Sequence, residues 1–339
     1  MATTISGNLS GDVVTKINTN AKTARSINKI INGNFDIWQR GTSQTADGYG
    51  SDDRWINYRT GSTQVASRQP FPLGQTDVPN NPKYYARTVV SSVAGAGNYV
   101  IKAQNIEGVQ NFQGTTATIS FWAKADASKN IAVECIQYFG TGGSPSTQVS
   151  EIGVTTVALT ASWAKHTVSV AIPSISGKTL GTNDNDYLGV YLWMDAGSSY
   201  NARTNSLGQQ SGTFEFSQIQ MEAGSVATDF EQRSVGEELA LCQRYFERNV
   251  QFGVVLILGY TCTGVPFAVT KRGVPSMTYY SGFNGAGTAG RLAEAEASGA
   301  AKVVGSSQFD KSGIRRITIS SAGYTMTTMR GSFDASAEL

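Results

Sequence analysis

Between residues 56 and 213 the chain alternates short strand-like runs with turns, and this pattern restricts the fold more than any other feature. The clearest runs are TATISFWAKA at 116–125, IAVECIQYF at 131–139, WAKHTVSVAIP at 163–173 and YLGVYLWMD at 187–195. No helical pattern of 10–15 residues separates them, so the runs favour antiparallel strands over βαβ units. Strands of this length and spacing predict a two-sheet sandwich.

Side-chain alternation within these runs indicates which residues face the core. In the run 116–125, Ile119, Phe121 and Ala123 occupy alternate positions and are expected on one face of a strand. His166, the single histidine, lies in the alternating run 163–173, where a structural place on a strand is expected rather than a catalytic role.

A capped helix is expected at residues 234–248, after a strand that begins at Phe214. Ser234 and Glu237 have the spacing of a capping box, in which each side chain accepts from an unpaired backbone N–H. One apolar stripe follows at helical spacing. Its members are Val235, Leu239, Cys242 and Phe246. The interpretation is a connector helix that packs between two β-rich regions.

The region after this helix, residues 249–339, is again β-like. Its strand-like runs are GVVLILGYTCTG (253–264), FAVTKRG (267–273), SMTYYSGF (276–283) and RRITIS (315–320). GAGTAG at 285–290 matches the dinucleotide-binding pattern G-x-G-x-x-G. That site needs a strand-to-helix turn inside a parallel sheet, and no second βαβ unit follows, so a hairpin loop is favoured.

The composition excludes several classes of protein. The 339 residues carry a formal charge of +2, from 27 basic and 25 acidic residues. This balance lacks the basic footprint of a protein that binds nucleic acid or an anionic membrane. The sequence has no run of about 18 apolar residues and no secretory signal pattern. We expect synthesis in a cytoplasm and no membrane insertion.

The cysteines indicate neither disulfides nor a metal site. Cys135, Cys242 and Cys262 are odd in number and far apart, without the spacing of a disulfide framework or of metal ligands.

Two acidic pairs are candidates for a cation site. Asp52 and Asp53 are adjacent and point to opposite faces of an extended chain, so a solvated turn is favoured, with a cation-binding loop and an acid pair left open. Asp184 and Asp186 place oxygen ligands at alternate positions, which suits Ca²⁺, although the glycine and distal glutamate of an EF-hand are absent. An ordinary polar turn is the alternative.

The first 31 residues differ in composition from the rest. A heptad-like seam runs through them. Its positions are Val13, Ile17, Asn20, Ala24, Ile27 and Ile31. A loosely ordered arm and a short docking or oligomerising helix remain equally open.

Four motifs together resemble tailed-bacteriophage virion proteins, which are fibre, spike or other appendage subunits. They are NGNFDIWQRG (32–41), DRW (53–55), QIQMEAGSVATDFE (218–231) and EELALCQRYFE (237–247). The resemblance covers most of residues 30–248 and implies a structural role, because the motifs name no catalytic residue.

Residues 30–233 also resemble the jelly-roll sandwiches of carbohydrate-binding modules, in which the opening strand and a closing Q-x-E strand lie together. Some of these modules hold a structural Ca²⁺ near these ends, and the matching positions are Asp36 and Glu222. We expect no cofactor, and the resemblance leaves a structural Ca²⁺ at these positions open.

The expected fold is mainly β: a jelly-roll-like antiparallel β-sandwich, a short connector helix and a smaller C-terminal β-sandwich domain. The expected parts are a docking or oligomerisation arm (1–31), the sandwich (32–233), the helix (234–248) and the C-terminal domain (249–339). Sugar contacts would come from aromatic side chains near loops, unless these belong to the core. They are Trp38, Trp55, Tyr279, Tyr280 and Phe283.

The resemblance implies a non-enzymatic virion subunit that contacts host surface glycan. We expect a homotrimer whose residues 1–31 dock onto other virion proteins. Two other functions remain open. One is an assembly protein without its own ligand, such as a head fibre, decoration or tail-adaptor subunit. The other is a capsule polysaccharide depolymerase.

Overall fold

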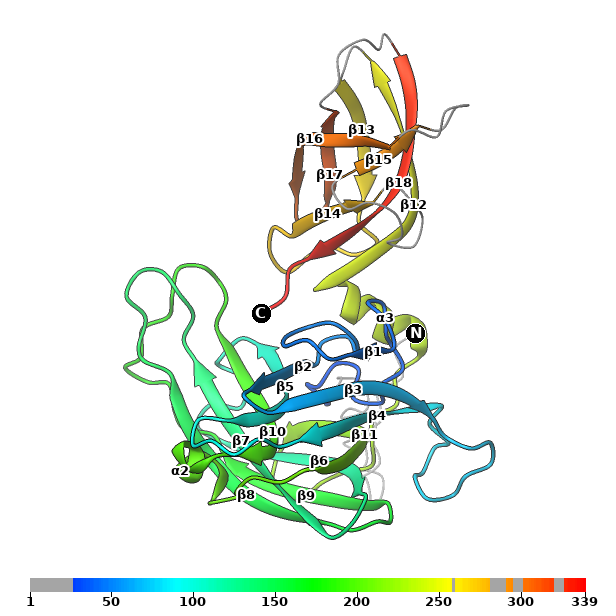
Figure 1. The fold of residues 1–339 in the computed structure, drawn as a ribbon. Helices are drawn as coiled ribbons and strands as arrows, with labels where there is room; N and C mark the ends of the chain where they lie inside the picture. The colour runs from blue at the N-terminus through cyan, green and yellow to red at the C-terminus, as the bar shows by residue number, and fades with distance from the viewer. Residues whose placement is uncertain (1–26, 258–259, 281–290, 295–300, 320–325) are drawn as a thin grey trace, which may run out of the picture.

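The chain forms two β domains joined by the helix α3 (Val235–Gln243) (Figure 1). The computed structural model describes residues 27–257, 260–280, 291–294, 301–319 and 326–339. The mainly β fold predicted from the sequence is confirmed, with antiparallel sheets and one short connector helix. Most of the expected N-terminal arm (1–26), the glycine-rich match at 285–290 and Phe283 lie outside the described residues.

The sandwich consists of a six-stranded and a five-stranded antiparallel sheet. In spatial order, the six strands are β1 (Ser43–Gln44), β3 (Thr63–Pro70), β4 (Tyr84–Ser91), β11 (Gly212–Ala223), β6 (Thr116–Ala125) and β9 (Ala164–Ala171). The five are β2 (Ile56–Thr60), β5 (Tyr99–Glu107), β10 (Tyr187–Ala196), β7 (Lys129–Tyr138) and β8 (Val149–Leu159). Two short helical turns follow β10, η1 (Ser198–Tyr200) and α2 (Asn201–Thr204). Consecutive strands repeatedly change sheet, which gives the jelly-roll-like topology.

The core lies between the two sheets and follows the alternation read from the sequence. Ile119, Phe121 and Ala123 of β6 are fully buried in it, as expected. β11 adds Phe214 and Phe216 from the same sheet. The opposite sheet supplies alternate apolar residues of β7 and β10. The long-range pairing of β11 with β4 and β6 therefore holds together segments that are far apart in the chain.

The motif at 32–41 begins with a turn, and no strand follows the turn, although the resemblance to carbohydrate-binding modules implies an opening strand here. Asn32 and Phe35 have positive φ angles of 56° and 57°, which a strand excludes. The segment nevertheless lies against the closing strand, because Lys29 N–H donates to Met221 O (2.9 Å) and Ile219 N–H donates to Gly33 O (2.9 Å). A Cβ on Gly33 would sit 2.0 Å from Ile219 O, so only glycine allows this approach. The predicted contact between opening and closing segments is present without a strand on the opening side.

Helix α3 is capped as predicted but buries a different face. The Ser234 Oγ accepts from Glu237 N–H at 3.2 Å. The predicted apolar stripe does not hold, since Val235 is 62% exposed and Phe246 already belongs to the next strand. The buried helix residues are Glu238 and Cys242. The Glu238 carboxylate accepts from Asn32 N–H, so the helix docks on the turn of the opening motif through a polar contact.

We expect Ser234→Ala to lower the free energy of unfolding by about 1 kcal/mol, because it removes the cap acceptor and leaves one helix N–H unpaired. The measurement is urea denaturation of the full chain. Ser234→Asp keeps an acceptor at this position and serves as the matched control. Equal midpoints for the alanine variant and the wild type would contradict a role for the cap.

The C-terminal domain is one seven-stranded antiparallel sheet that closes on itself through an additional β12–β18 pairing. In spatial order its strands are β12 (Phe246–Ile257), β13 (Tyr260–Pro266), β17 (Gly313–Ile319), β16 (Ala301–Asp310), β15 (Arg291–Glu294), β18 (Met326–Ser336) and β14 (Ser276–Tyr280). The strand predicted at 267–273 is wrong. This segment is a loop whose N–H groups of Phe267, Lys271 and Arg272 donate to Ser312, Lys311 and Arg244 carbonyls outside any ladder.

Charged side chains join the two domains. Glu338, which follows β18, forms ion pairs with Arg40 (2.8 Å) and with Arg54 of the sandwich. Arg54 is 1% exposed, and its guanidinium carbon lies 3.5 Å from the centre of the Tyr245 ring. Arg248 of β12, which pairs with Asp334 of the same domain at 2.7 Å, also donates to Gln39 O of the sandwich at 3.2 Å. These contacts tie the start and the end of the C-terminal domain to the sandwich.

Asp53 makes this junction sensitive to pH. Its carboxylate accepts from Gln39 N–H at 3.0 Å, and Gln39 Nε2 also donates to Phe246 O at 2.9 Å. Burial raises the pKa of Asp53 to about 6, against the opposing effect of Arg40 and together with the nearby Glu338 charge. The folded protein therefore holds this proton more tightly than the unfolded chain does.

We expect the free energy of unfolding to fall by about 1–2 kcal/mol from this group as pH rises from about 4 to about 6. Asp53→Asn removes the contribution, so the difference between wild type and variant should change over this window and be flat above it. Urea denaturation at four pH values measures it. A constant difference from pH 4 to pH 7 would contradict the assignment.

No helix within the described residues is long and apolar enough to cross a membrane.

Candidate functional site

The outer face of the five-stranded sheet carries a row of aromatic side chains. Along β10, Leu188, Val190 and Leu192 point into the core, so Tyr187 and Tyr191 point outward. Other strands of the sheet add to this face. Its half-exposed tyrosines are Tyr58 from β2, Tyr99 from β5, Tyr138 from β7, Tyr187 from β10 and Tyr200 from η1. We call this surface the tyrosine face.

The rings of the tyrosine face contact one another across the strands. Tyr138 and Tyr187 are direct cross-strand partners, and their ring centres lie 4.8 Å apart. The ring centres of Tyr58 and Tyr191 lie 6.2 Å apart. Tyr99 reaches Tyr200 at 5.2 Å. Mutual contact holds the rings in place, so a ligand meets a surface that is already ordered.

Gly189 makes room for this arrangement at the centre of the face. A Cβ at Gly189 would lie 2.7 Å from both Ile136 Cγ1 and Tyr191 Cε1. The missing side chain therefore lets the Tyr191 ring lie down over β10.

Glu134 lies under one end of the tyrosine face and is fully paired. Its carboxylate, 0% exposed, accepts two hydrogen bonds of 2.8 Å from Arg203 and one of 3.0 Å from Trp193 Nε1. Arg203 also lies over the Trp193 ring, at 4.9 Å from its centre. Glu134 thus anchors α2 to the sheet, and its burial leaves no free carboxylate for acid or base chemistry.

The hydroxyls of Tyr58, Tyr187 and Tyr191 stay protonated over the physiological range. Burial raises the pKa of Tyr58 to about 12, and it raises the pKa of Tyr187 and Tyr191 as well. Neutral phenols both donate and accept hydrogen bonds, so this face combines flat apolar rings with hydroxyl groups at their edges.

The aromatic residues predicted from the sequence occupy other places. Trp55 is fully buried against Phe35, and Tyr279 is 4% exposed, so neither ring offers a face to a sugar. For these two the alternative of a place in the core holds, because loop proximity does not imply exposure. Trp38 and Tyr280 are half-buried and hydrogen-bonded, Trp38 Nε1 to Phe35 O (2.6 Å) and Tyr280 hydroxyl to Asp334 (3.2 Å).

The predicted metal ligands are not gathered into one cluster. Glu222 accepts from Thr228 N–H and hydroxyl, both at 2.8 Å, and Asp36 accepts from Asn34 at 2.9 Å. Asp186 accepts from Val109 N–H at 2.7 Å, while Asp184 is exposed. Within the described ranges, no group of three or more His, Cys, Asp or Glu side chains could hold a metal ion. Calcium at these residues stays a prediction.

Asp52 and Asp53 do not form the solvated turn that the sequence favoured. Each is 1% exposed, and the side chains of Asp52 and Lys102 form a fully buried ion pair. Asn57 bridges the two, donating to Asp52 at 3.1 Å and accepting from Lys102 at 2.8 Å. This pair is a structural element inside the sandwich, at the DRW motif.

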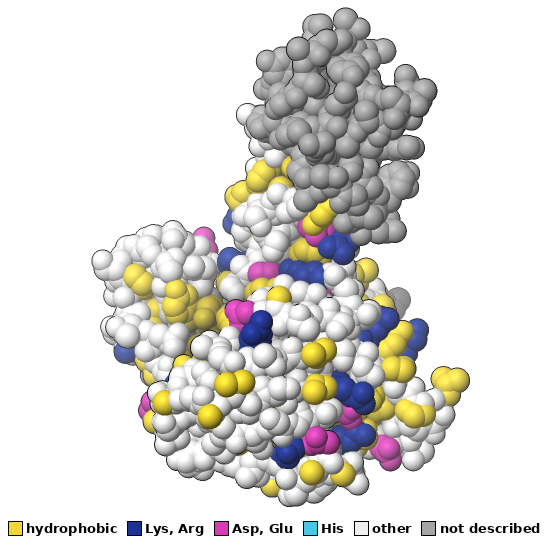
Figure 2. All heavy atoms as spheres, viewed as in Figure 1, with side chains coloured by type: hydrophobic (Ala, Val, Ile, Leu, Met, Phe, Trp, Pro, Cys, Tyr) yellow, Lys and Arg dark blue, Asp and Glu magenta, His cyan; other side chains and the backbone are white. Residues whose placement is uncertain are grey.

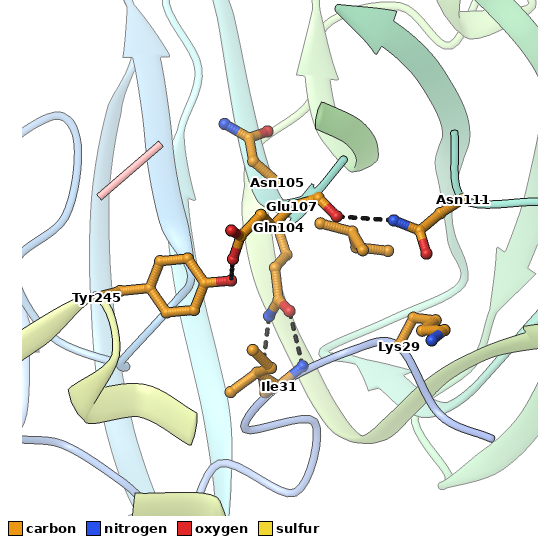
Figure 3. A pocket seen from close by; sticks show the side chains of 8 residues that line it. Lys29, Ile31, Gln104, Asn105, Glu107, Asn111 and Tyr245 are labelled. Carbon is orange, nitrogen blue, oxygen red and sulfur yellow. Dashed lines mark hydrogen bonds between the residues drawn. The ribbon is translucent and has the colours of Figure 1, made fainter. Parts of the chain in front are cut away.

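A pocket of about 140 Å³ lies between the opening segment, β5 and the end of α3 (Figure 3). Figure 3 shows Gln104 reaching Ile31, which it holds by two hydrogen bonds of 2.7 and 2.8 Å to the backbone. On the other side Glu107 accepts from Tyr245 at 2.8 Å and from Arg244 at 2.7 Å. These polar groups bind chain segments to one another, which makes the pocket part of the domain junction.

The sequence contains a signal for the tyrosine face that does not depend on proximity to loops. In the run 187–195, Tyr187, Tyr191 and Trp193 all fall on one parity, opposite to Leu188, Val190 and Leu192. A strand whose two faces are both apolar, with aromatics on only one of them, indicates an aromatic outer surface. The fold and this surface define a jelly-roll-like β-sandwich with an aromatic face, joined to a second β domain.

Solved structures with a similar fold include carbohydrate-binding modules. A CBM4 structure is 18% identical to this chain and has a TM-score of 0.33. The match covers 59% of this chain and 100% of the CBM4 chain. A family 11 carbohydrate-binding module from Clostridium thermocellum is 13% identical over 55% of this chain and 98% of its own, with a TM-score of 0.31. The enzymatically active domain of Bacteriophage CBA120 tailspike protein 4 is 11% identical over 58% of this chain and 22% of its own, with a TM-score of 0.32. No protein-family model and no curated protein matches the sequence.

Proposed function

We propose that this chain is a non-enzymatic structural subunit of a tailed-bacteriophage virion appendage, of the fibre or spike type, which contacts host surface glycan through the tyrosine face. The virion part rests on the four motifs at 32–41, 53–55, 218–231 and 237–247. The glycan part rests on one observation, the ordered row of half-exposed aromatic rings on the five-stranded sheet.

Flat aromatic rings suit pyranose sugars because the apolar C–H face of the sugar stacks on the ring while its hydroxyls reach polar groups at the edge. Tyr138 and Tyr187 offer two neighbouring rings for this purpose, and the phenol groups supply both donors and acceptors. An open face of this kind binds each sugar weakly. In a trimer, which we propose as the assembly state, three such faces would gain affinity by acting together.

The structural motifs also support the proposal, because they build the junction between the domains. Asn32 of the first motif turns the chain and meets α3 through Glu238. Gln218–Glu231 of the third motif contains the closing strand and its connector, and Glu231 accepts from Asn28 N–H at 2.8 Å. These residues fix the angle between the two β domains, as expected for a rod-like subunit.

A non-enzymatic role is supported by the state of two acidic groups near the tyrosine face. Glycoside hydrolysis requires two carboxylates about 5–10 Å apart across the sugar. Glu134 is buried and bound by Arg203, and Glu107 is bound by Arg244 and Tyr245, which together hold its pKa below the usual range. Carboxylates engaged in this way are poor general acids.

The test of glycan contact is a binding experiment with the full chain and an array of bacterial surface polysaccharides. Tyr138→Ala and Tyr187→Ala should each weaken binding by at least about tenfold, because each removes one stacking ring. Tyr84→Ala, which removes a half-buried tyrosine of the other sheet, is the matched control and should bind as the wild type does. Equal binding by all three variants would refute the tyrosine face as the glycan site.

An assembly role without a ligand is the second candidate, and the charged domain junction favours it. Binding to none of the polysaccharides, combined with labelling on the head or the tail adaptor in virion micrographs, would decide for it. Release of reducing sugar from host capsule by the purified protein would instead establish a depolymerase.

A further inference from the structure

The opposite, six-stranded sheet carries a second group of aromatic side chains on its outer face. Phe71 comes from the loop after β3, Tyr85 from β4 and Trp163 from the turn before β9. Their ring centres lie 4.7 Å (Phe71–Tyr85), 5.3 Å (Phe71–Trp163) and 5.3 Å (Tyr85–Trp163) apart. Phe71 and Trp163 remain partly exposed. The rings come from three separate segments and are placed together only by the fold.

A charged row lies directly beside these rings. Glu215 of β11 is the register partner of both Arg87 and Lys124, so the three side chains cross β4, β11 and β6 in one line. Glu215 is 4% exposed and accepts from Arg87 Nε at 2.6 Å, while Lys124 Nζ lies 3.1 Å from its second oxygen. The side chains of Arg87 and Lys124 are 34% and 29% exposed. Each cation therefore keeps N–H donors that face solvent.

A second row follows on the same face. Trp122 of β6, partly exposed, is the register partner of Ser217 on β11 and of Lys165 on β9. The Ser217 hydroxyl is fully buried and has no hydrogen-bond partner among the described residues. A buried polar atom without a partner is uncommon, because it loses its bonds to water on folding.

Three basic side chains outnumber the acidic ones on this surface. Arg87, Lys124 and Lys165 lie on it with two carboxylates that the strand register places there, Glu215 and Glu222. Figure 2 shows dark-blue basic side chains beside magenta and yellow ones over β4, β11 and β6. Lys124 Nζ lies 5.4 Å from the centre of the Trp163 ring, so the ammonium group and the ring can contact the same ligand.

We propose that this face of the six-stranded sheet is a second saccharide site, and that it takes a sugar bearing a carboxylate. Trp163 and Trp122 provide surfaces on which the pyranose ring stacks. Arg87 and Lys124 bind the sugar carboxylate with the donors that Glu215 leaves free. The site lies on the opposite side of the sandwich from the tyrosine face. Binding at one site can therefore be lost while binding at the other remains.

The test uses the full chain with two probes, an oligogalacturonate of six residues and its fully methyl-esterified form. Tryptophan fluorescence and calorimetry measure binding at low and at moderate salt. The wild type should bind the acid form at least about tenfold more tightly than the ester, and this preference should shrink as salt rises. Trp163→Ala should weaken binding of both probes by at least about tenfold.

Lys124→Gln should reduce the preference for the acid form and leave the melting temperature unchanged, because Arg87 still pairs with Glu215. Lys178→Gln, an exposed loop lysine, is its matched control and should change nothing. Trp163→Phe keeps an aromatic surface, and it should bind better than the alanine variant if that variant is folded. Equal binding of acid and ester, no saturable binding of either, or unchanged binding by Trp163→Ala would each overturn the proposal.

Discussion

Replacing Lys102 with methionine is expected to destabilise the sandwich by about 3–5 kcal/mol, because the Asp52 carboxylate then stays buried without its cation. The side chains of both residues are 0% exposed. The other Asp52 oxygen accepts from Ser51 Oγ at 2.7 Å, which cannot neutralise the charge. Urea denaturation followed by tryptophan fluorescence measures the effect.

Two further variants separate the charge from the loss of packing. Asp52→Asn combined with Lys102→Met removes both charges and should recover part of the stability, because no unpaired charge is left. Lys83→Met, at an exposed position, should change the free energy of unfolding by less than about 0.5 kcal/mol. If Lys102→Met and Lys83→Met had the same midpoint, the buried pair would have no structural role.

Glu338→Gln is expected to uncouple the two domains. Arg54 is 1% exposed, and after the change its guanidinium loses its carboxylate partner and keeps neutral ones, among them Asn105 O (2.7 Å), the Tyr245 ring and the Tyr49 hydroxyl. Removing one partner of a buried ion pair costs about 3–5 kcal/mol, and here the loss falls on the contact between the domains. Calorimetry should therefore show two thermal transitions in place of one, or a wider separation between two.

Asp77→Asn, in an exposed loop of the sandwich, is the matched control for Glu338→Gln and should leave the calorimetric trace unchanged. Small-angle scattering of the full chain adds a second measurement, because a loosened junction widens the distribution of distances between the domains. A single unchanged transition together with an unchanged scattering profile would mean that other contacts set the domain angle.

The buried ion pairs show why part of the structure could not be read from the sequence. Asp52 and Asp53 sit in a glycine-rich stretch that favours a solvated turn. Lys102, the partner of Asp52, is a residue of β5 with apolar neighbours. A local pattern contains no information on a partner 50 positions away, and the Coulomb energy that decides burial depends on that distance in space.

The exposure of the aromatic residues also could not be read from the sequence. Trp55 follows a polar loop, yet its ring packs on Phe35 with centres 5.3 Å apart and is fully buried. Tyr187 lies inside a strand and looks like core, yet it is half-exposed. The position in the sequence indicated only whether a ring lies near a loop or in a strand. Exposure was decided by what the opposite strand and the connecting segments place over the ring.

The sequence by itself determined the β class, the extent of β6, β10 and the other clear strands, the helix start at Ser234 and the division into two β regions. These features depend on side-chain alternation and on capping within a few residues, so they are local. The tertiary structure alone decided the closure of the last sheet, the turn at Asn32, the buried charges at the junction and the two aromatic faces. Each of these depends on pairing between distant segments, because strand register and packing set which side chains meet and which remain in solvent.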